Sequence, residues 1–185
     1  KEFYKAQQQG SYNSACVVIP LVLKYVRANS VLDVGCGVGT WLSAWKKYGL
    51  EITGLDGDYV PNEMLFISSK AFIPTDLSKR ILIKKRFDIV STLEVAEHLP
   101  KERGESFVED LTRLSDVILF SAAIPGQGGT NHVNEQWQSY WRELFRRRGF
   151  SCFDIIRPHI WGDNRVDICY RQNTFLYVKS DRIYK

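Results

Sequence analysis

Short β-branched runs alternate with helix-length segments along the chain, and this alternation strongly limits the folds it can adopt. Residues 30–35 and 51–56 are two such runs, and a segment with helical spacing of apolar residues lies between them at 41–48. Strands that are joined through helices form crossover connections, which produce a mostly parallel sheet covered by helices on both faces. The sequence therefore predicts an α/β fold with three layers.

The same patterns predict the remaining elements. A length of 185 residues is close to that of one domain, at roughly 150 residues each, so we expect a single domain over residues 1–185. Residues 157–173 carry no regular pattern, and an irregular stretch of this length is more typical of a binding loop than of a spacer. The predicted strands are 30–35, 51–56, 71–73, 87–93, 116–122, 150–156 and 174–179, and the predicted helices are 11–27, 41–48, 77–85, 101–114 and 135–148.

Composition excludes several classes of protein. With 44% hydrophobic and 25% charged residues, the chain is not disordered, collagen-like or a coiled coil. No apolar run approaches the roughly 18 residues that a membrane span needs, and the opening residues lack the apolar core of a signal peptide. The four cysteines each lie in or beside an apolar stretch, which favours buried thiols in a reducing compartment. We therefore expect a cytoplasmic protein with no membrane partner.

The charge pattern argues against nucleic acid as a partner. Lys and Arg number 25 against 21 Asp and Glu, a net charge of only +4, although three arginines are consecutive at residues 146–148. No run interleaves basic residues with aromatic residues that look exposed, as RNA-binding surfaces do. A small-molecule substrate is favoured, and the sequence carries no signal for an oligomeric state.

A glycine-rich turn with the spacing G-x-G-x-G follows the first predicted strand and precedes a helix. Glycines there let a ligand approach the backbone, and the helix N-terminus offers free amides. The dinucleotide fingerprint is G-x-G-x-x-G, so this spacing argues against NAD. Asp33 stands two residues before Gly35, where it can meet a cationic amine. A cofactor with an amino-acid tail, such as S-adenosylmethionine, carries one.

Two further carboxylates follow the next strands. Asp56 ends the second strand about 20 residues after the turn, where it can accept hydrogen bonds from ribose hydroxyls. Asp76 follows the third strand and can accept from an exocyclic adenine amine. Each residue alone also fits a helix cap or a turn, but their order at successive strand ends favours a nucleoside site.

With these motifs, VLDVGCGVGTW above all, the sequence resembles the class I S-adenosylmethionine-dependent methyltransferases. The resemblance covers nearly the whole chain. It implies a Rossmann-like three-layer α/β/α sandwich whose seven-stranded, mostly parallel sheet has an antiparallel last strand, with S-adenosylmethionine at the strand carboxyl ends. The residues that it assigns to the cofactor are Asp33, Gly35, Gly37 and Leu93 for the methionine part, Asp56 and Gly57 for the ribose, and Asp76 with the Leu77 amide for the adenine.

The candidate acceptor chemistry lies in an E-x-x-E-H segment after the fourth strand. Glu94, Glu97 and His98 are spaced so that one helical turn would place them on one face beside the methyl group. His132 follows the fifth strand, after a loop with glycines at 126, 128 and 129 that can reach the same cleft. Carboxylates and imidazoles can bind a divalent cation such as Mg²⁺.

Three roles for this set remain open. Glu94, Glu97, His98 and His132 could bind a metal, His98 or His132 could act as a general base without one, or all four could be structural. E-x-x-E-H with a later His resembles the metal-dependent small-RNA 3′-terminal 2′-O-methyltransferases, and E-x-x-E-H alone resembles the metal-assisted O-methyltransferases of ubiquinone synthesis. Both resemblances point to oxygen as the methyl acceptor.

The sequence therefore predicts O-methylation of a small-molecule hydroxyl, on a sugar or a biosynthetic intermediate, with these four residues as the catalytic candidates. One alternative is a metal-dependent RNA 2′-O-methyltransferase. The other is a non-catalytic subunit that binds S-adenosylmethionine and serves a partner.

Overall fold

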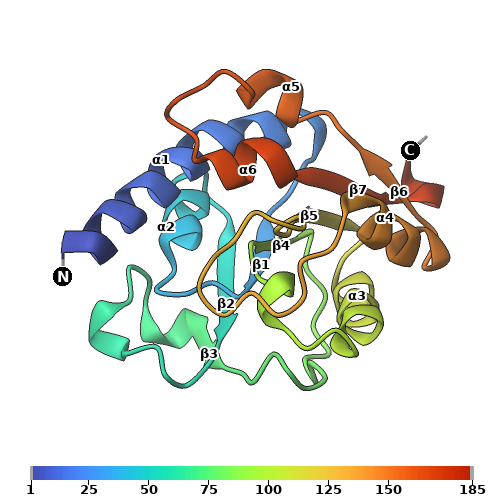
Figure 1. The fold of residues 1–185 in the computed structure, drawn as a ribbon. Coiled ribbons are helices and arrows are strands. Elements are labelled where there is room, and N and C mark those ends of the chain that lie inside the picture. Colours follow the sequence, from blue (N-terminus) through green and yellow to red (C-terminus); the bar gives the residue numbers. More distant parts are fainter. Residues whose placement is uncertain (1, 184–185) are drawn as a thin grey trace.

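The computed structural model describes residues 2–183 and contains one seven-stranded sheet (Figure 1). The strand order is β3-β2-β1-β4-β5-β7-β6, and only β7 runs antiparallel to its neighbours β5 and β6. The predicted mostly parallel sheet with an antiparallel last strand is confirmed. The strands are β1 (Ser30–Val34), β2 (Glu51–Asp56), β3 (Phe72–Pro74), β4 (Ile89–Leu93), β5 (Val117–Ser121), β6 (Phe150–Phe153) and β7 (Phe175–Lys179).

Helices cover both faces of this sheet, and each face has its own apolar core. α1 (Glu2–Tyr25), α2 (Thr40–Lys47), α5 (Arg157–Ile160) and α6 (Ile168–Asn173) contribute to one core, which includes the fully buried Trp45. α3 (Arg103–Leu114) and α4 (Gln138–Arg147) contribute to the other, around Phe107 and Trp141. The expected three layers are therefore present. The 3₁₀ helices among the described residues are Asn62–Met64, Ser69–Ala71, Ala96–His98 and Ser180–Arg182.

Glycine ends two of these helices. Gly49 and Gly149 have φ values of 83° and 78°, a left-handed conformation that lets the chain leave α2 and α4 sharply. Each glycine leads into the strand that follows, β2 and β6 respectively. This is why the predicted starts of those strands agree closely with the observed ones.

The helix predicted over residues 77–85 is wrong. Residues 75–88, all of which the structure describes, contain neither helix nor strand. Backbone groups in this segment bond instead to side chains of α3, including Arg103 and Asp110. Bonds from a neighbouring element thus replace the local ones that a helix would have made.

Two other expectations need correction. Residues 157–173 are not irregular throughout, because α5 and α6 form at their two ends. The segment packs on α1, where the Asp167 amide donates to Ser14 Oγ over 2.9 Å. Cys36 is buried as expected, but Cys16 is exposed because it lies on the outward face of α1. Within residues 2–183, no helix combines the length and the apolar character that crossing a membrane requires.

Candidate functional site

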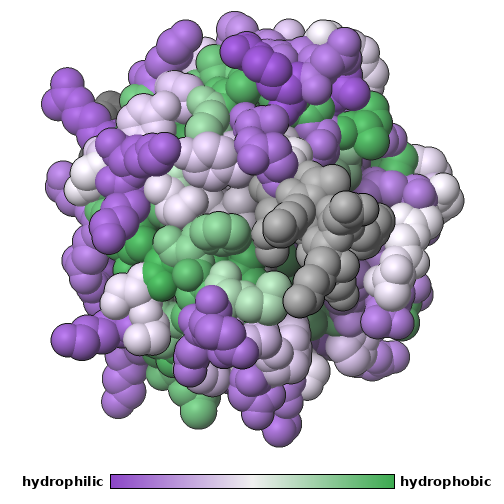
Figure 2. All heavy atoms as spheres, turned by 90° about the vertical axis from the view of Figure 1, so that its left-hand side faces the viewer, coloured by the Kyte–Doolittle hydropathy of each residue, from purple (hydrophilic) through white to green (hydrophobic). Residues whose placement is uncertain are grey.

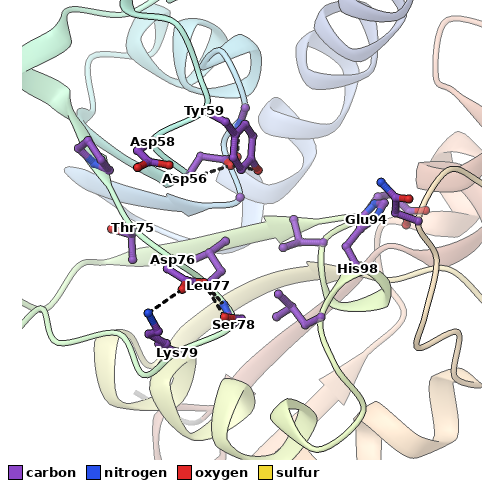
Figure 3. A pocket seen from close by; sticks show the side chains of 17 residues that line it. Asp56, Asp58, Tyr59, Thr75, Asp76, Leu77, Ser78, Lys79, Glu94 and His98 are labelled. Carbon is purple, nitrogen blue, oxygen red and sulfur yellow. Dashed lines mark hydrogen bonds and ion pairs between the residues drawn. The ribbon is translucent and has the colours of Figure 1, made fainter.

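A cavity of about 930 Å³ lies at the carboxyl ends of β1, β2 and β4. Its walls come from the glycine turn after β1, the end of β2, the residues after β3 and the segment after β4. Figure 3 shows Asp56 and Asp76 across the cavity from Glu94 and His98. Of the predicted site residues, those that line it are Gly35, Gly37, Asp56, Gly57, Asp76, Leu77, Glu94 and His98.

The glycine turn brings bare backbone to the cavity. Gly37 has φ 52°, and a Cβ added there would meet no described atom within 4 Å, so the space above it is open to a ligand. A Cβ on Gly35 would lie only 2.3 Å from Val95. The two glycines therefore have different roles. Gly37 leaves space for a ligand, and Gly35 lets the segment after β4 pack closely against the turn.

Asp33 lies in the sheet below this turn and is 4% exposed. Its partner in the register of β1 and β4 is Ser91, whose hydroxyl donates to Asp33 Oδ1 over 2.7 Å. Burial raises the Asp33 pKa to about 7, and the Asp56 carboxylate adds to this against the opposing effect of the Ser91 bond. Neither Asp33 nor Leu93 is among the described residues that line the cavity.

Asp56 is buried at the end of β2 and is bound through both carboxylate oxygens. The Gly37 amide donates to Oδ2 over 2.6 Å, and the Gly57 amide donates to Oδ1 over 2.7 Å. The Tyr59 hydroxyl also donates to Oδ1, over 2.6 Å. A ribose hydroxyl that approached Oδ1 would therefore compete with Tyr59, a residue that the sequence pattern did not single out.

Tyr59 lies at the open side of the cavity. Its ring lies so close to Gly57 that a Cβ on this glycine would be 2.0 Å from it, yet the residue is 78% exposed. Figure 2 faces the side of the molecule that carries the segment between β2 and β3, and it shows apolar side chains at the surface among polar ones. Met64 and Phe66, both exposed, belong to that segment.

Asp76 and Leu77 form the wall opposite Glu94. The Asp76 carboxylate accepts from the Ser78 amide over 3.0 Å and from the Ser78 hydroxyl over 2.6 Å, and Lys79 lies 3.1 Å away. These hydrogen bonds, from Ser78 first and then Lys79, lower the Asp76 pKa. The carboxylate thus stays ionised and able to accept a further bond.

The segment after β4 does not form the expected helical face. Glu94 has φ 56°, and the 3₁₀ helix begins only at Ala96, so Glu94 precedes the turn that holds Glu97 and His98. The prediction that all three side chains lie on one face of a helical turn is wrong, because Glu94 lies outside the 3₁₀ helix in a left-handed backbone conformation.

Glu97, His98 and His132 nevertheless come together. Their ligand atoms all lie within 4.8 Å of one another, and the two imidazole rings meet edge to face at 4.8 Å. Glu97 is fully buried, and neither of its carboxylate oxygens has a hydrogen-bond partner within residues 2–183. Burial, with a further contribution from the Glu94 carboxylate, raises the Glu97 pKa to about 8. Burial also lowers the His98 pKa, and His132 adds to that effect.

Glu135 fixes the loop that carries His132. Its carboxylate accepts from the amides of Gly126 and Gly128 over 2.8 and 2.9 Å. It also lies 2.9 Å from His132 Nδ1. The glycine loop therefore reaches the E-x-x-E-H segment as expected, held by a carboxylate that the sequence pattern did not identify.

Glu94 is bound by two amide side chains from distant parts of the chain. Gln127 Nε2 donates to Glu94 Oε2 over 2.8 Å, and Asn173 Nδ2 donates to Oε1 over 3.3 Å. Asn173 also donates to Gln127 Oε1 over 2.7 Å. Sequence alone missed both residues, and no local pattern around either one marks a site.

Comparison with known proteins identifies relatives of this chain. A family model described as a methyltransferase domain matches residues 13–154. A ubiquinone biosynthesis O-methyltransferase from Proteus mirabilis (strain HI4320) is 29% identical over 106 residues, which are 50% of this chain and 43% of that protein. The chain spans about half the length of the curated relatives it matches.

Two solved structures share the fold. Magnesium protoporphyrin IX methyltransferase from Synechocystis PCC 6803, with bound SAM, has a TM-score of 0.66 at 21% identity, covering 92% of this chain and 80% of that one. Streptomyces venezuelae DesVI has a TM-score of 0.70 at 14% identity, covering 95% and 94%. The resemblance to class I methyltransferases is thus confirmed by the family match and by the fold.

Proposed function

This chain belongs to the methyltransferase domain family, and on that premise we propose that it transfers the methyl group of S-adenosylmethionine to a hydroxyl group of a small molecule. The sulfonium of this cofactor supplies an activated methyl group when bound. The chain must then hold the donor, orient the acceptor and deal with the acceptor's proton.

The residues that line the cavity, with Asp33 and Leu93 next to them in the sheet, fit the cofactor. Open backbone at Gly37 and the ionisable Asp33 below it suit the methionine end, where Asp33 would pair with the ammonium group. Asp56 would accept from the ribose in place of the Tyr59 hydroxyl. Asp76 and the Leu77 amide would receive the adenine, with Gly57 and Leu93 beside the ribose and the methionine.

One observation supports oxygen as the acceptor above others: Glu97 is a fully buried carboxylate without a described partner, next to two imidazoles. Burial raises the Glu97 pKa to about 8, so without a cation this carboxyl group carries a proton near neutral pH. A cation among Glu97, His98 and His132 would bind and stabilise its ionised form. A divalent cation bound there would stabilise a deprotonated hydroxyl. His98 also lines the cavity, so an acceptor at this cluster would lie next to the cofactor.

Glu94 has a different role in this proposal from the one its spacing suggested. Gln127 and Asn173 already bind both of its oxygens, so it would shape the acceptor side of the cavity and stay outside the ligand set. Without a metal, His98 or His132 would take the proton of the hydroxyl directly.

The proposed acceptor is a sugar or a biosynthetic intermediate. The match to a ubiquinone biosynthesis O-methyltransferase supports this class over RNA, and so does a sequence in which basic residues do not interleave with exposed-looking aromatics. An RNA 3′-terminal ribose and a non-catalytic role remain the alternatives to be tested.

A methyl-transfer assay separates these possibilities. S-adenosylmethionine labelled on its methyl group is incubated with the protein, Mg²⁺ or Mn²⁺, and a panel of catechols, sugars and short RNA oligonucleotides. We expect labelled O-methyl product and S-adenosylhomocysteine from a small hydroxyl compound. Label in RNA alone would favour the RNA enzyme, and cofactor binding without product from any acceptor would favour the non-catalytic subunit.

A further inference from the structure

The irregular segment from residue 77 to residue 83 is bound by one face of α3. Arg103 donates from Nε to the Leu77 carbonyl over 3.2 Å and from Nη2 to the Lys79 carbonyl over 2.8 Å. Asp110, seven residues further along the helix, accepts from the Ile81 amide over 3.0 Å. Positions seven apart lie on one side of a helix, so α3 presents these two side chains together.

Arg103 and Asp110 also form a buried ion pair with each other. Arg103 Nη2 donates to Asp110 Oδ2 over 2.5 Å, and the two side chains are 5% and 0% exposed. Arg103 Nη1 donates to Ser106 Oγ over 2.7 Å. Each nitrogen of the guanidinium therefore has a partner, which fixes the plane of the group.

The bond to Leu77 bears directly on the cavity. The Leu77 carbonyl and the Ser78 amide belong to one peptide unit, which is planar. Arg103 binds the carbonyl end of this unit, and the amide end donates to the Asp76 carboxylate over 3.0 Å. Orienting the first bond orients the second, so a side chain of α3 sets the direction of a carboxylate in the cavity wall. Figure 3 shows Asp76, Leu77 and Ser78 in that wall.

We infer that Arg103, supported by Asp110, is a positioning residue for recognition of the adenine amino group by Asp76. The inference rests on the proposed binding of S-adenosylmethionine. Arg103 does not line the cavity and acts through the planar peptide between Leu77 and Ser78. By orienting Asp76, Arg103 places a hydrogen-bond acceptor opposite the exocyclic amine of adenine, which is a donor. Hypoxanthine has a carbonyl at that position and cannot donate to Asp76.

Arg113 provides the matched control. It also lies on α3 and bonds to the segment, but to the carbonyls of Ile81 and Ile83, which are not among the described residues that line the cavity. Replacing Arg113 loosens the same segment, but at residues 81–83, which do not face the ligand.

The test compares S-adenosylhomocysteine with S-inosylhomocysteine by calorimetry. The variant Arg103→Met/Asp110→Leu removes both buried charges together, so no unpaired buried charge remains to unfold the protein. Arg80 also loses its contact with Asp110, but it is half exposed and keeps its ion pair with Glu109. Arg103→Lys is a second variant, because one ammonium keeps the ion pair but cannot hold two carbonyls in fixed directions. Circular dichroism and thermal melting establish which variants are folded.

In either variant we expect affinity for S-adenosylhomocysteine to fall about tenfold, the loss of roughly one hydrogen bond to a charged acceptor. Affinity for S-inosylhomocysteine should stay the same, so the preference for adenine falls, while Arg113→Met retains that preference. Equal losses for both ligands, or an equal loss of preference in Arg113→Met, would overturn the inference. Failure of the unmodified protein to bind S-adenosylhomocysteine would instead overturn the proposed function on which it rests.

Discussion

The Glu135 carboxylate lies 2.9 Å from His132 Nδ1, and because an ionised carboxylate only accepts hydrogen bonds, this contact sets the tautomer of the His132 imidazole. Two amides of the glycine loop, at Gly126 and Gly128, bind the same carboxylate. These three bonds lower the Glu135 pKa, with the His132 bond contributing most. The charged carboxylate fixes Nδ1 as the donor, which leaves Nε2 for a cation or an acceptor proton.

Replacement of Glu135 should therefore impair catalysis and spare the cofactor. In Glu135→Gln we expect kcat for methyl transfer to fall about 10- to 100-fold, since the neutral amide orients the imidazole poorly. Affinity for S-adenosylhomocysteine should not change. Glu143→Gln is the control, because Glu143 is a carboxylate on the outer face of α4 that pairs with Arg146 and Arg147. A similar loss of kcat in both variants would contradict the role of Glu135.

Asp56 should account for a large part of cofactor affinity. In Asp56→Ala we expect binding of S-adenosylhomocysteine to weaken by about 1–3 kcal/mol through loss of hydrogen bonds to a charged acceptor. Calorimetry measures this, with Asp58→Ala as control, since Asp58 lines the same cavity but is exposed. A loss of the same size in the control would mean that general negative charge, and not the Asp56 bonds, attracts the ligand.

Cofactor affinity should depend on pH through Asp33, whose pKa burial raises to about 7. The cofactor ammonium pairs with the ionised carboxylate, so binding below this pKa must expel a proton. Affinity for S-adenosylhomocysteine should rise by up to about tenfold per pH unit towards pH 7 and level off above it. Titrations from about pH 5 to pH 9 test this, and in Asp33→Asn the dependence should flatten.

Without ligand, Asp33 should make the folding stability fall as pH rises, which is the opposite of its effect on cofactor affinity. The folded-state pKa lies above that of the unfolded chain, so the folded state binds more protons between about pH 4 and pH 7. The Asp33 contribution to the free energy of unfolding is therefore present at low pH and is lost as pH rises through about 7. Thermal melts of the ligand-free protein and of Asp33→Asn measure this, as the difference in melting temperature at each pH. If the stability of the unmodified protein relative to Asp33→Asn rose with pH, the assignment would be contradicted.

The parts of the site that the sequence predicted are those that depend on local order along the chain. Gly37 and Asp56 could be assigned to one site in advance because adjacent parallel strands end at one edge of the sheet, and the structure joins them by a bond of 2.6 Å. Asp76 follows from the same rule one strand further on.

The parts that it missed depend on contacts between distant residues. Asn173 reaches Glu94 across 79 positions, and nothing in the residues around either one encodes that meeting. The segment at 77–83 has apolar spacing compatible with a helix, but Arg103 and Asp110 satisfy its backbone from outside. Glu94 has φ 56°, a left-handed conformation that interrupts the helical spacing on which the prediction for residues 94–98 depended.

The last prediction concerns the cluster of Glu97, His98 and His132, and it follows from a carboxylate whose oxygens are buried without a described partner. If a cation serves there, EDTA should abolish methyl transfer, and Mg²⁺ or Mn²⁺ should restore it. Glu97→Gln should bind Mn²⁺ at least about tenfold more weakly, as measured by electron paramagnetic resonance, and lose most of kcat, with cofactor affinity unchanged. Full activity in EDTA would remove the metal and leave His98 or His132 as the base. Full activity in both His98→Ala and His132→Ala would remove the base as well, so that orientation of the two substrates alone would account for the rate.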